Sequence, residues 1–560
     1  MDRSPDGLEN ALGEYAAHRI SRRDLLKRAG LLGVAATVLG PLVASGTAGA
    51  TTPSRRPGLR EALSGSPKSG GNFREGYDRI FTPPDPVANA WADPDFNALF
   101  EALVMRNPEG QIVPMLADTF TSGPHGWTFH LRDGLHFQSG VPLTAAAVVE
   151  DFNLFRSPKT GQNGPFWTPV TDVTANGQDI ICSTTHPFQA FQETVTTEYS
   201  YIMDPDTWKA DGASYGTKAT NGTGPFVMTS FSPSEHVVAE RWEDYPGSIV
   251  PFFQNKGKAY LDSITWISIS DASERAPQIQ TGLVDAIKNP PPQDVDTLRD
   301  NPDIVVLEYQ ELSNFFLSVN MGEDSLGFND LRVRQAISQA IDREAIVQSI
   351  FLGHAVATYG PVMTKYKWYN PAVEQYNQFN LQKAESLLDD AGWKKGSSGV
   401  RTKNGKPLSF KTFNLTDETQ NQVMQAMSQM LANVGIDMQV ESLSQAAFYP
   451  ELSQKVLSYA FKWLWSSPID VAVLFVKFYQ HQSSVLNPLY DSYNAWQQAA
   501  SVAQLKSTAY AFQEIFARTV PIIPIYTQNT IWAHTNNVVG WQPNQANLYP
   551  FYNDVWLRDA

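Results

Sequence analysis

The clearest hydrophobic pattern in the chain is the stretch Asn314–Val347, NFFLSVNMGEDSLGFNDLRVRQAISQAIDREAIV. Its aromatic and branched residues at Phe315–Val319 predict a strand, and a loop rich in turn-forming residues follows. Asp330 stands at the N-cap of a predicted helix whose apolar residues recur at helical spacing. Asp342 caps a second predicted helix that runs to about Phe351. The stretch therefore predicts a strand, a loop and two consecutive helices.

Three further patterns predict elements elsewhere in the chain. Alternation of apolar and polar residues at Trp127–Leu131 predicts a half-buried strand. Thr144 is the expected N-cap of a following helix, and Asn380–Trp393 has the apolar face and terminal glycine of an amphipathic helix. The apolar run Asn97–Met105 predicts another helix. Strands and helices are therefore mixed along the whole chain.

The first 50 residues read as an export signal. Ser21–Lys27 holds paired arginines, Ala29–Ser45 is small and apolar, and Ala48–Ala50 has the small-x-small pattern of a cleavage site. This resembles a twin-arginine signal, and a transmembrane helix is the alternative. From the signal we expect a protein that is exported to the periplasm or another extracytoplasmic space. Since no cysteine follows the apolar run, we expect that it is not a lipoprotein. Residues 51–70 predict a flexible lead-in.

Length, composition and charge narrow the class of protein. The chain of 560 residues exceeds one ordinary hydrophobic core, and its 42% hydrophobic and 18% charged residues are typical of a globular protein. The net charge of −15 argues against nucleic acid and against an anionic membrane surface as direct partners. We therefore expect a globular protein of more than one domain.

The residues give no catalytic or metal-binding pattern. The single cysteine, Cys182, cannot form a disulfide within the chain, and its branched neighbours (DIICST) predict a buried strand. The nine histidines lack the spacing of metal ligands. We therefore expect no enzyme activity, cofactor or metal. A glycosidase stays open, because its two acids can lie far apart in sequence.

At least six ordered sequence blocks stand out along the chain. They include WTFHLRDG…PLTAAAV (Trp127–Val148), GTGPF (Gly222–Phe226), GLVDAI (Gly282–Ile287), DLRVRQA (Asp330–Ala336), AIDR (Ala340–Arg343), KAESLLDDAGW (Lys383–Trp393) and VPIIPIYTQNTIWAH with VVGW (Val520–Trp541). These blocks resemble family 5 extracellular solute-binding proteins, the dipeptide- and oligopeptide-binding receptors of ABC importers, and the resemblance spans about residues 70–541. One departure is Ala147, where the family usually has an aspartate. The glycines of GTGPF suit positive backbone φ angles.

The resemblance implies an α/β fold, namely a two-lobed periplasmic-binding-protein fold of type II with an extra subdomain in the first lobe. The lobes would be joined by a hinge that the chain crosses twice, near Tyr309 and near Tyr526, and the ligand would bind between them. The implied divisions are an export signal at 1–50, a lead-in at 51–70, lobe 1 at 71–310 with a subdomain at about 96–220, lobe 2 at 311–525, and a return to lobe 1 at 526–560.

The resemblance also implies a function. The protein would be a monomeric substrate-binding component that captures a small solute and delivers it to the ABC permease in the membrane. The resemblance to the family favours a short peptide as the solute, and an oligosaccharide or another neutral solute is the alternative. A non-transport enzyme such as an oligosaccharide hydrolase, and a ligand-sensing receptor, are the alternatives.

The segment YAFKWLWSSPIDVAVLF is the main candidate for ligand contact. In peptide receptors of the family, the matching turn carries a carboxylate that holds the amino terminus of the ligand. Here Ser466 and Ser467 replace the first acidic residue, and Asp470 follows a few places on. Hydroxyl groups bond neutral groups but do not offset a buried ammonium. Trp463 and Trp465 alternate, so both would face one side, either stacking on the ligand or packing in the core.

Five more aromatic residues are candidate ligand contacts. They lie beside prolines or on loops, where flat side chains can face a cleft. These residues are Tyr77, Trp91 and Trp167 in the first lobe, and Trp368 and Tyr369 in the second.

If Trp465 is a stacking platform, Trp465→Ala should weaken ligand binding by about 1–3 kcal/mol, because the ligand loses a buried aromatic contact. Titration calorimetry of the variant checks this, with its thermal unfolding midpoint as the control. An unchanged affinity at normal stability would remove Trp465 from the site.

Overall fold

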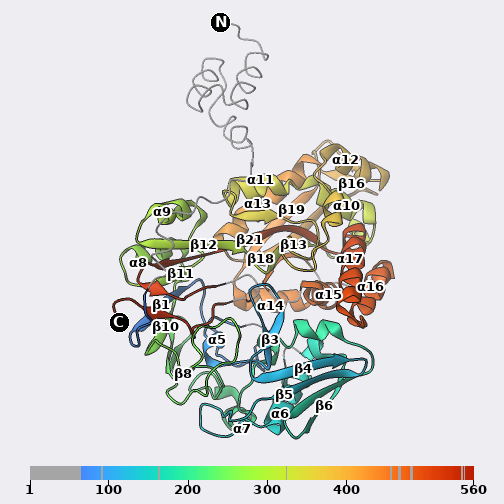
Figure 1. Cartoon of the computed structure of the whole chain (residues 1–560). Coiled ribbons are helices and arrows are strands. Elements are labelled where there is room, and N and C mark those ends of the chain that lie inside the picture. Colours follow the sequence, from blue (N-terminus) through green and yellow to red (C-terminus); the bar gives the residue numbers. More distant parts are fainter. Residues whose placement is uncertain are drawn as a thin grey trace, which may run out of the picture. The chain divides into compact units, whose positions relative to one another are not determined.

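The chain folds around β21 (Ile523–Thr535), a strand of 13 residues that two parts of a 12-stranded sheet share in this computed structural model (Figure 1). The first half of β21 pairs with β13 (Ser313–Ser318) and β14 (Ala355–Ala357). Its second half pairs with β12 (Ile304–Gln310) and β11 (Ala286–Lys288). We call the elements around β11 the first lobe and the elements around β13 the second lobe.

The structure describes residues 65–89, 92–161, 164–322, 324–454, 457–464, 468–479, 484–543, 547 and 549–560. The expected export signal and most of the lead-in lie outside these residues, and so do Trp91, Trp465, Ser466 and Ser467.

In the described part of the first lobe, the two larger sheets are accompanied by two small ones, β2-β3 and β22-β23. From β11 the large sheet continues through β1, β10, β9 and β8, and β1 is parallel to both of its neighbours. A second, four-stranded antiparallel sheet has the order β4-β5-β7-β6. Gln138, which follows β5, donates to the Phe226 carbonyl oxygen at 2.6 Å and thereby ties this sheet to β8. The strands of the lobe are β1 Asn72–Tyr77, β2 Val104–Arg106, β3 Ile112–Pro114, β4 Ala117–Gly123, β5 Gly126–Leu131, β6 Val170–Asn176, β7 Asp179–Thr184, β8 Phe226–Ser232, β9 His236–Arg241, β10 Ser263–Ser268, β22 Val538–Val539 and β23 Trp556–Leu557, and its helices are α5 Phe96–Leu99, α6 Ala145–Arg156, α7 Pro205–Asp211, α8 Ala272–Gln280 and α9 Val295–Asp300.

In the second lobe the sheet continues from β21 through β13, β20, β18 and β19. Its apolar core gathers side chains of β13, β21 and the surrounding helices, and a three-stranded sheet of β15, β16 and β17 lies apart from the large one. The strands are β15 Lys394–Lys395, β16 Arg401–Lys403, β17 Lys406–Pro407, β18 Ser409–Leu415, β19 Asp437–Leu443 and β20 Ser458–Leu464, and the helices are α10 Leu331–Ala340, α11 Arg343–Ile350, α12 Leu381–Asp390, α13 Glu418–Asn433, α14 Gln445–Gln454, α15 Pro468–Tyr479, α16 Asn487–Gln497 and α17 Val502–Thr519.

The predicted helix starts are confirmed by side-chain hydrogen bonds to backbone N–H groups. Asp330 accepts from Arg332 N at 3.0 Å, Asp342 from Ala345 N at 2.9 Å, and Asn380 from Lys383 N at 2.9 Å. Thr144 likewise caps α6 through Ala147 N. Each of these helices therefore begins where its cap residue predicted.

Two predictions in the first lobe are wrong. The run Asn97–Met105 is a helix only to Leu99 and becomes β2 at Val104, since tertiary contacts satisfy its backbone: Glu101 N donates to Thr223 Oγ1 at 3.0 Å. Gly222 and Gly224 are needed for close approach and not for positive φ, because a Cβ at Gly222 would lie 2.1 Å from the Leu99 carbonyl oxygen. Cys182 was correctly placed in a strand, β7, and burial raises the pKa of its thiol to about 12.

Two buried arginines hold the start of β21. Arg334 of α10 donates to the carbonyl oxygens of Thr519 and Val520 at 2.7 and 3.0 Å. Arg343 of α11 donates to the carbonyl oxygen of Pro524 at 2.8 Å. Buried guanidinium groups need such partners, so these two residues fasten α10 and α11 to the strand that both lobes share.

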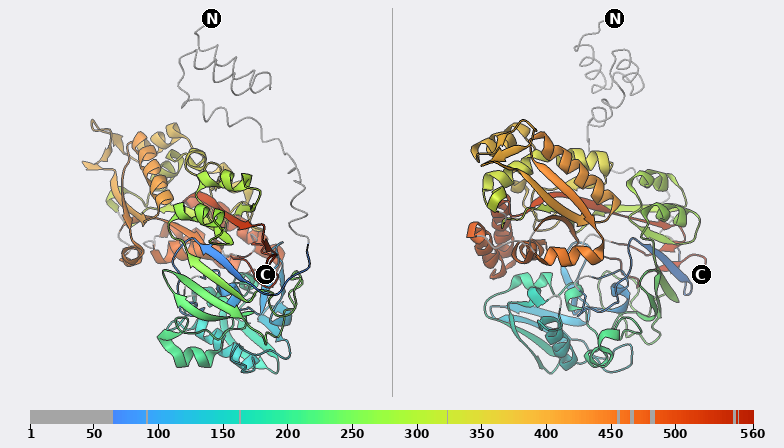
Figure 2. Two further views of the ribbon diagram at one scale, coloured as in Figure 1. Left: turned by 90° about the vertical axis from the view of Figure 1, so that its left-hand side faces the viewer. Right: turned by 180° about the vertical axis from the view of Figure 1, so that it is seen from behind.

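The end of the chain returns to β1, as the red and blue segments in Figure 2 show. There, Tyr552 donates to Glu75 Oε2 at 2.8 Å and receives a hydrogen bond from Trp266 Nε1 at 2.9 Å. Glu75 is fully buried, and this burial raises its pKa to about 8. The folded protein therefore holds Glu75 protonated near neutral pH, which links folding to proton uptake.

We expect the free energy of unfolding of the wild type to fall, relative to that of Glu75→Gln, as the pH rises from about 5 to about 9. The pKa of Glu75 is higher in the folded than in the unfolded chain, so the contribution of the protonated group is fully present below the unfolded pKa and is lost as the pH rises through about 8. The difference should reach on the order of 4 kcal/mol in denaturant unfolding curves. The exposed Glu240→Gln on β9 is the control, and equal pH profiles for all three proteins would contradict the expectation.

Candidate functional site

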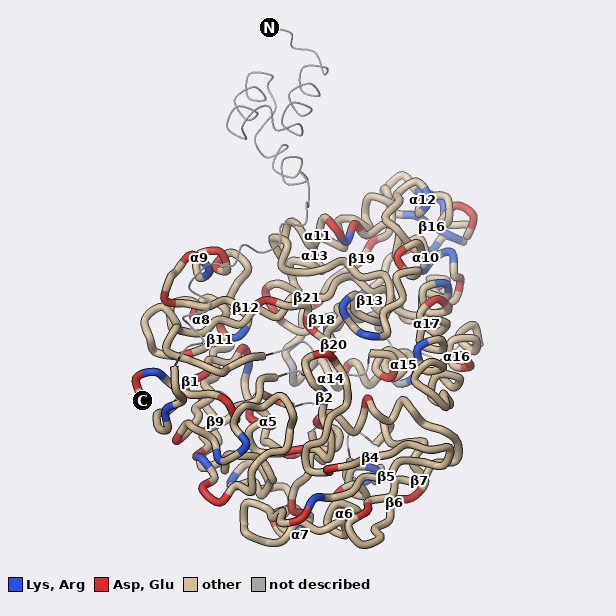
Figure 3. The backbone as a smooth tube through the Cα atoms, viewed as in Figure 1, with Lys and Arg blue, Asp and Glu red and all other residues tan. Residues whose placement is uncertain are grey.

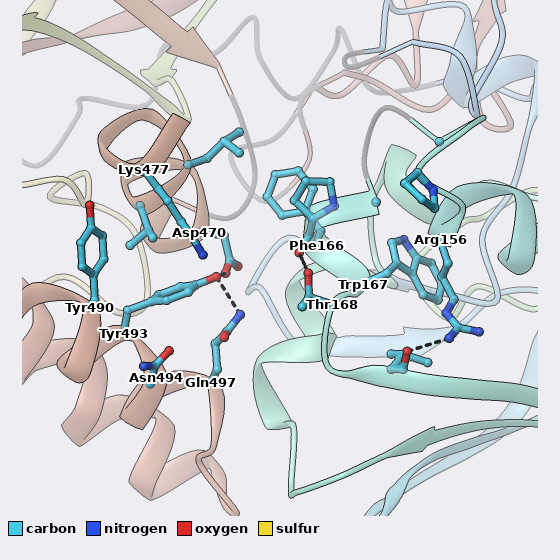
Figure 4. A pocket seen from close by; sticks show the side chains of 17 residues that line it. Arg156, Phe166, Trp167, Thr168, Asp470, Lys477, Tyr490, Tyr493, Asn494 and Gln497 are labelled. Carbon is cyan, nitrogen blue, oxygen red and sulfur yellow. Dashed lines mark hydrogen bonds between the residues drawn. The ribbon is translucent and has the colours of Figure 1, made fainter. Parts of the chain in front are cut away.

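A cavity of about 930 Å³ lies between the two lobes. The first lobe contributes the end of α6, the start of β6 and the short 3₁₀ helix Gly164–Trp167, and the second lobe contributes α15 and α16. Figure 4 shows Asp470, Tyr493 and Gln497 on one side, facing Phe166 and Trp167 on the other. The volume is in the range of small-molecule sites.

Polar groups of the second lobe form a hydrogen-bonded chain along the cavity wall. Tyr493 donates to Asp470 Oδ1 at 2.7 Å, and Gln497 Nε2 donates to the Tyr493 hydroxyl at 2.7 Å. Burial, and then the nearby Asp470, raise the pKa of Tyr493 far above its usual value, so the phenol stays protonated and keeps donating. The chain of bonds fixes the direction of the carboxylate, whose residue is only 8% exposed.

The wall of the first lobe is aromatic. Phe166 stacks on Tyr199 with ring centroids 4.5 Å apart, and Trp167 Nε1 donates to the Tyr199 carbonyl oxygen at 3.1 Å. The ring of Trp167 is enclosed by Phe152 at 4.8 Å and Phe191 at 5.1 Å, which leaves the residue 1% exposed. Trp167 therefore shapes the wall but does not offer a free face for stacking.

Two of the described lining residues are cations. Lys477 lies two turns after Asp470 on the same face of α15, and Val473 and Leu474 lie between them. Arg156, at the end of α6, donates to the Val170 carbonyl oxygen at 2.8 Å on the opposite wall. The cavity thus combines one carboxylate, two cations, tyrosine hydroxyls, amides and an apolar face.

Of the predicted ligand contacts, the structure brings Asp470 and Trp167 together at this cavity. Tyr77 is fully buried elsewhere, where its hydroxyl donates to Asp93 at 3.0 Å. Trp368 and Tyr369 are not among the residues that line the cavity. Instead, Trp368 donates to Glu193 and Tyr369 donates to Glu374. Trp463 lies in β20 opposite Asn314, and its side chain is outside the described part of the chain.

The remaining lining residues escaped the sequence analysis. Those on α16, namely Tyr490, Tyr493, Asn494 and Gln497, share one face of the helix at spacings of three, four and seven. That spacing is a detectable signal, but it does not say which surface the face meets. The contribution of Phe166 and Arg156 from the other lobe has no signal of its own.

Among the residues that the structure describes, no three His, Cys, Asp or Glu side chains are grouped so that they could hold a metal ion. The same part of the chain has no helix with the length and apolar character needed to cross a membrane.

The two lobes, the shared strand and the cavity between them define a solute-binding protein of the two-lobed type. The chain belongs to the family of bacterial extracellular solute-binding proteins, family 5, whose sequence model matches residues 111–484. Proteins of this family are the substrate-binding components of ABC transporters, and this chain is one of them. The predicted family, fold class and general function are confirmed.

Individual relatives bind different solutes. The chain is 26% identical over 394 residues to the nickel-binding periplasmic protein of Escherichia coli K12, covering 66% of this chain and 71% of that protein. It is 24% identical over 466 residues to the glutathione-binding protein GsiB of the same strain, covering 79% of this chain and 86% of that protein. The oligopeptide-binding protein AppA of Bacillus subtilis, solved with a nonapeptide, has a similar fold (TM-score 0.74, 20% identity, 88% of this chain and 100% of that chain).

Tyr493→Phe should destabilise the protein by about 1–3 kcal/mol, because Asp470 and Gln497 both lose a buried hydrogen-bond partner. Denaturant unfolding measures the change. Tyr490→Phe on the same helix is the matched control: the Tyr490 hydroxyl is buried and has no hydrogen-bond partner among the described residues, so its removal should cost little. A larger loss for Tyr490→Phe than for Tyr493→Phe would contradict the assigned bonds.

Proposed function

We propose that this protein captures a short peptide with a free amino terminus in the cavity between its lobes and delivers it to the ABC permease. The observation that carries the proposal is the position of Asp470, a largely buried carboxylate on the wall of an interlobe cavity. An ammonium group taken out of water needs such a carboxylate to offset its charge.

The cations of the cavity support the same class of ligand. Lys477 and Arg156 can bind a carboxylate, so a zwitterionic peptide finds a partner for each of its ends. Asp470 thus supplies the charge that the serines at 466 and 467 lack. The relatives that bind glutathione and a nonapeptide support a peptide ligand as well. An oligosaccharide or another neutral solute would leave these charges without a ligand partner and is less favoured.

The proposed protein is a monomeric carrier and not an enzyme. Members of its family are binding proteins, and the lining groups serve here to hold a ligand and release it unchanged. Nucleic acid is not a proposed partner: the net charge is −15, and Lys and Arg are interspersed with Asp and Glu on the face in Figure 3, although basic residues gather near α12 and β16. The proposed membrane partner is the permease.

Family 5 proteins work outside the cytoplasm, and the proposed route of this chain is twin-arginine export without lipid attachment. The pairing of β21 supports lobe boundaries near residues 311 and 525, with crossings near Tyr309 and Tyr526. In this proposal the two crossings form the hinge.

A ligand that binds only the folded state raises stability, by about 2.7 kcal/mol at 100 times its dissociation constant. We expect dipeptides to pentapeptides to raise the thermal unfolding midpoint of the purified protein, and mass spectrometry should find the peptides intact afterwards. N-acetylation of the peptides should abolish the rise, because it removes the ammonium that Asp470 holds. Asp470→Asn should reduce the rise for the same reason, and Glu235→Gln at an exposed site should not.

Three results would contradict the proposal. Equal stabilisation by free and N-acetylated peptides would remove the role of Asp470. Stabilisation by α-linked or β-linked oligosaccharides alone would replace the peptide with a sugar. Chemical change of the bound compound would make the protein an enzyme.

A further inference from the structure

A buried carboxylate, Glu193, joins the two lobes beside the cavity. It ends the short 3₁₀ helix Gln189–Glu193 of the first lobe, and its side chain is 1% exposed. From the first lobe, Arg106 Nη2 lies 2.9 Å from Glu193 Oε2. This ion pair is buried on both sides, since the Arg106 side chain is only 2% exposed.

Three consecutive residues of the second lobe donate to the same carboxylate. The Tyr366 hydroxyl donates to Oε2, while Lys367 Nζ lies 3.1 Å and Trp368 Nε1 lies 3.3 Å from Oε1. Burial by itself raises the pKa of Glu193, but Arg106 and Lys367 outweigh burial and the pKa lies below its usual value. The carboxylate therefore stays charged, and four donors from two lobes meet on it.

The donor segment 366–368 is anchored within its own lobe. Gln513 of α17 donates to the Trp368 carbonyl oxygen at 2.6 Å and accepts from Asn370 N at 3.0 Å. Lys367 also reaches the carbonyl oxygen of Gly110, in the turn between β2 and β3, at 3.5 Å. Hydrogen bonds therefore connect the segment both to α17 in its own lobe and to the first lobe.

The same short helix also forms the back of the cavity wall. Phe191, two residues before Glu193, packs edge-on against Trp167 with ring centroids 5.1 Å apart. The backbone N–H of Gln189 donates to the Ala499 carbonyl oxygen, just after α16, at 3.3 Å. Glu193 and the backing of the cavity wall thus belong to one short helix, which contacts the second lobe directly.

We propose that Glu193 is a positioning residue for solute capture, which holds segment 366–368 of the second lobe against the first lobe and so keeps the cavity closed. The proposal deepens the proposed function and rests on it for the identity of the occupant. The proposal also assigns a role to the region around the four-stranded sheet, because that region supplies both Glu193 and the cavity wall at Trp167. Taking the partners away from a buried charge is costly, so a single neutralising substitution should suffice to loosen the contact.

The distance between the lobes tests the proposal without any ligand. Spin labels at Thr174→Cys on β6 and Ala503→Cys on α17, both exposed, report the distribution of interlobe distances. The native Cys182 is fully buried and should not react. Glu193→Gln keeps the shape of the side chain and removes its charge, and Lys367→Met removes a donor from the other lobe. Lys209→Met, which breaks an exposed ion pair with Glu150 inside the first lobe, is the control.

We expect one narrow distance distribution for the wild type and for Lys209→Met. Glu193→Gln and Lys367→Met should each raise the ratio of separated to joined lobes roughly tenfold or more. The double variant should change the free energy of lobe separation by less than the sum of the two single changes, since both act on one contact. Lys367 is partly exposed, so its variant keeps the test valid if Glu193→Gln does not fold.

Unchanged distributions in both variants would overturn the proposal, as would a wild type with widely separated lobes. For a peptide that stabilises the wild type, the dissociation rate should rise in both variants, and a purely structural role of Glu193 would lower stability without this rise. If no peptide binds but the distances respond as expected, the proposed ligand is wrong and the role of Glu193 stands.

Discussion

The structure depends on one strand being shared by two lobes. The first half of β21 completes the sheet of the second lobe, and its second half completes the sheet of the first. Arg334 of α10 and Arg343 of α11 donate to carbonyl oxygens at or just before its start and so fasten these two helices to it. In the proposed hinge, a change in the angle between the lobes would bend β21 near its middle, together with the neighbouring step from β12 to β13.

This constraint explains why the cavity and the contacts between the lobes occur together. The strand limits where the lobes can separate, and the opposing surfaces away from it carry both the cavity and the Glu193 contact. Asp470 and Tyr493 belong to the second lobe, while Phe166 and Trp167 belong to the first, so the cavity is lined by both lobes. A solute held in the cavity would therefore contact both lobes, and in our proposal Glu193 holds the lobes together without touching the solute.

Elements whose signals are local could be predicted from the sequence. Asp330, Asp342, Asn380 and Thr144 begin their helices as expected, because an N-cap acts on backbone groups two or three residues away. The run Asn97–Met105 failed because its apolar residues fit a buried strand as well as a helix, and contacts with residues more than 100 positions away decided between the two. Trp167 was predicted as a ligand contact and lies in the cavity wall, but the phenylalanines that cover its ring could not be foreseen.

The sequence by itself determined the strand and helix starts of the second lobe, the family and the general task of binding a solute, because these depend on short patterns and ordered blocks. Only the tertiary structure decided that Asp470 meets Tyr493 and Gln497, that Phe166 and Arg156 face them, and that Glu193 receives donors from 173 to 175 residues away. The physical reason is that a cavity is made by surfaces that different lobes bring together. Hydrogen bonds across such a surface leave no periodic trace in either segment alone.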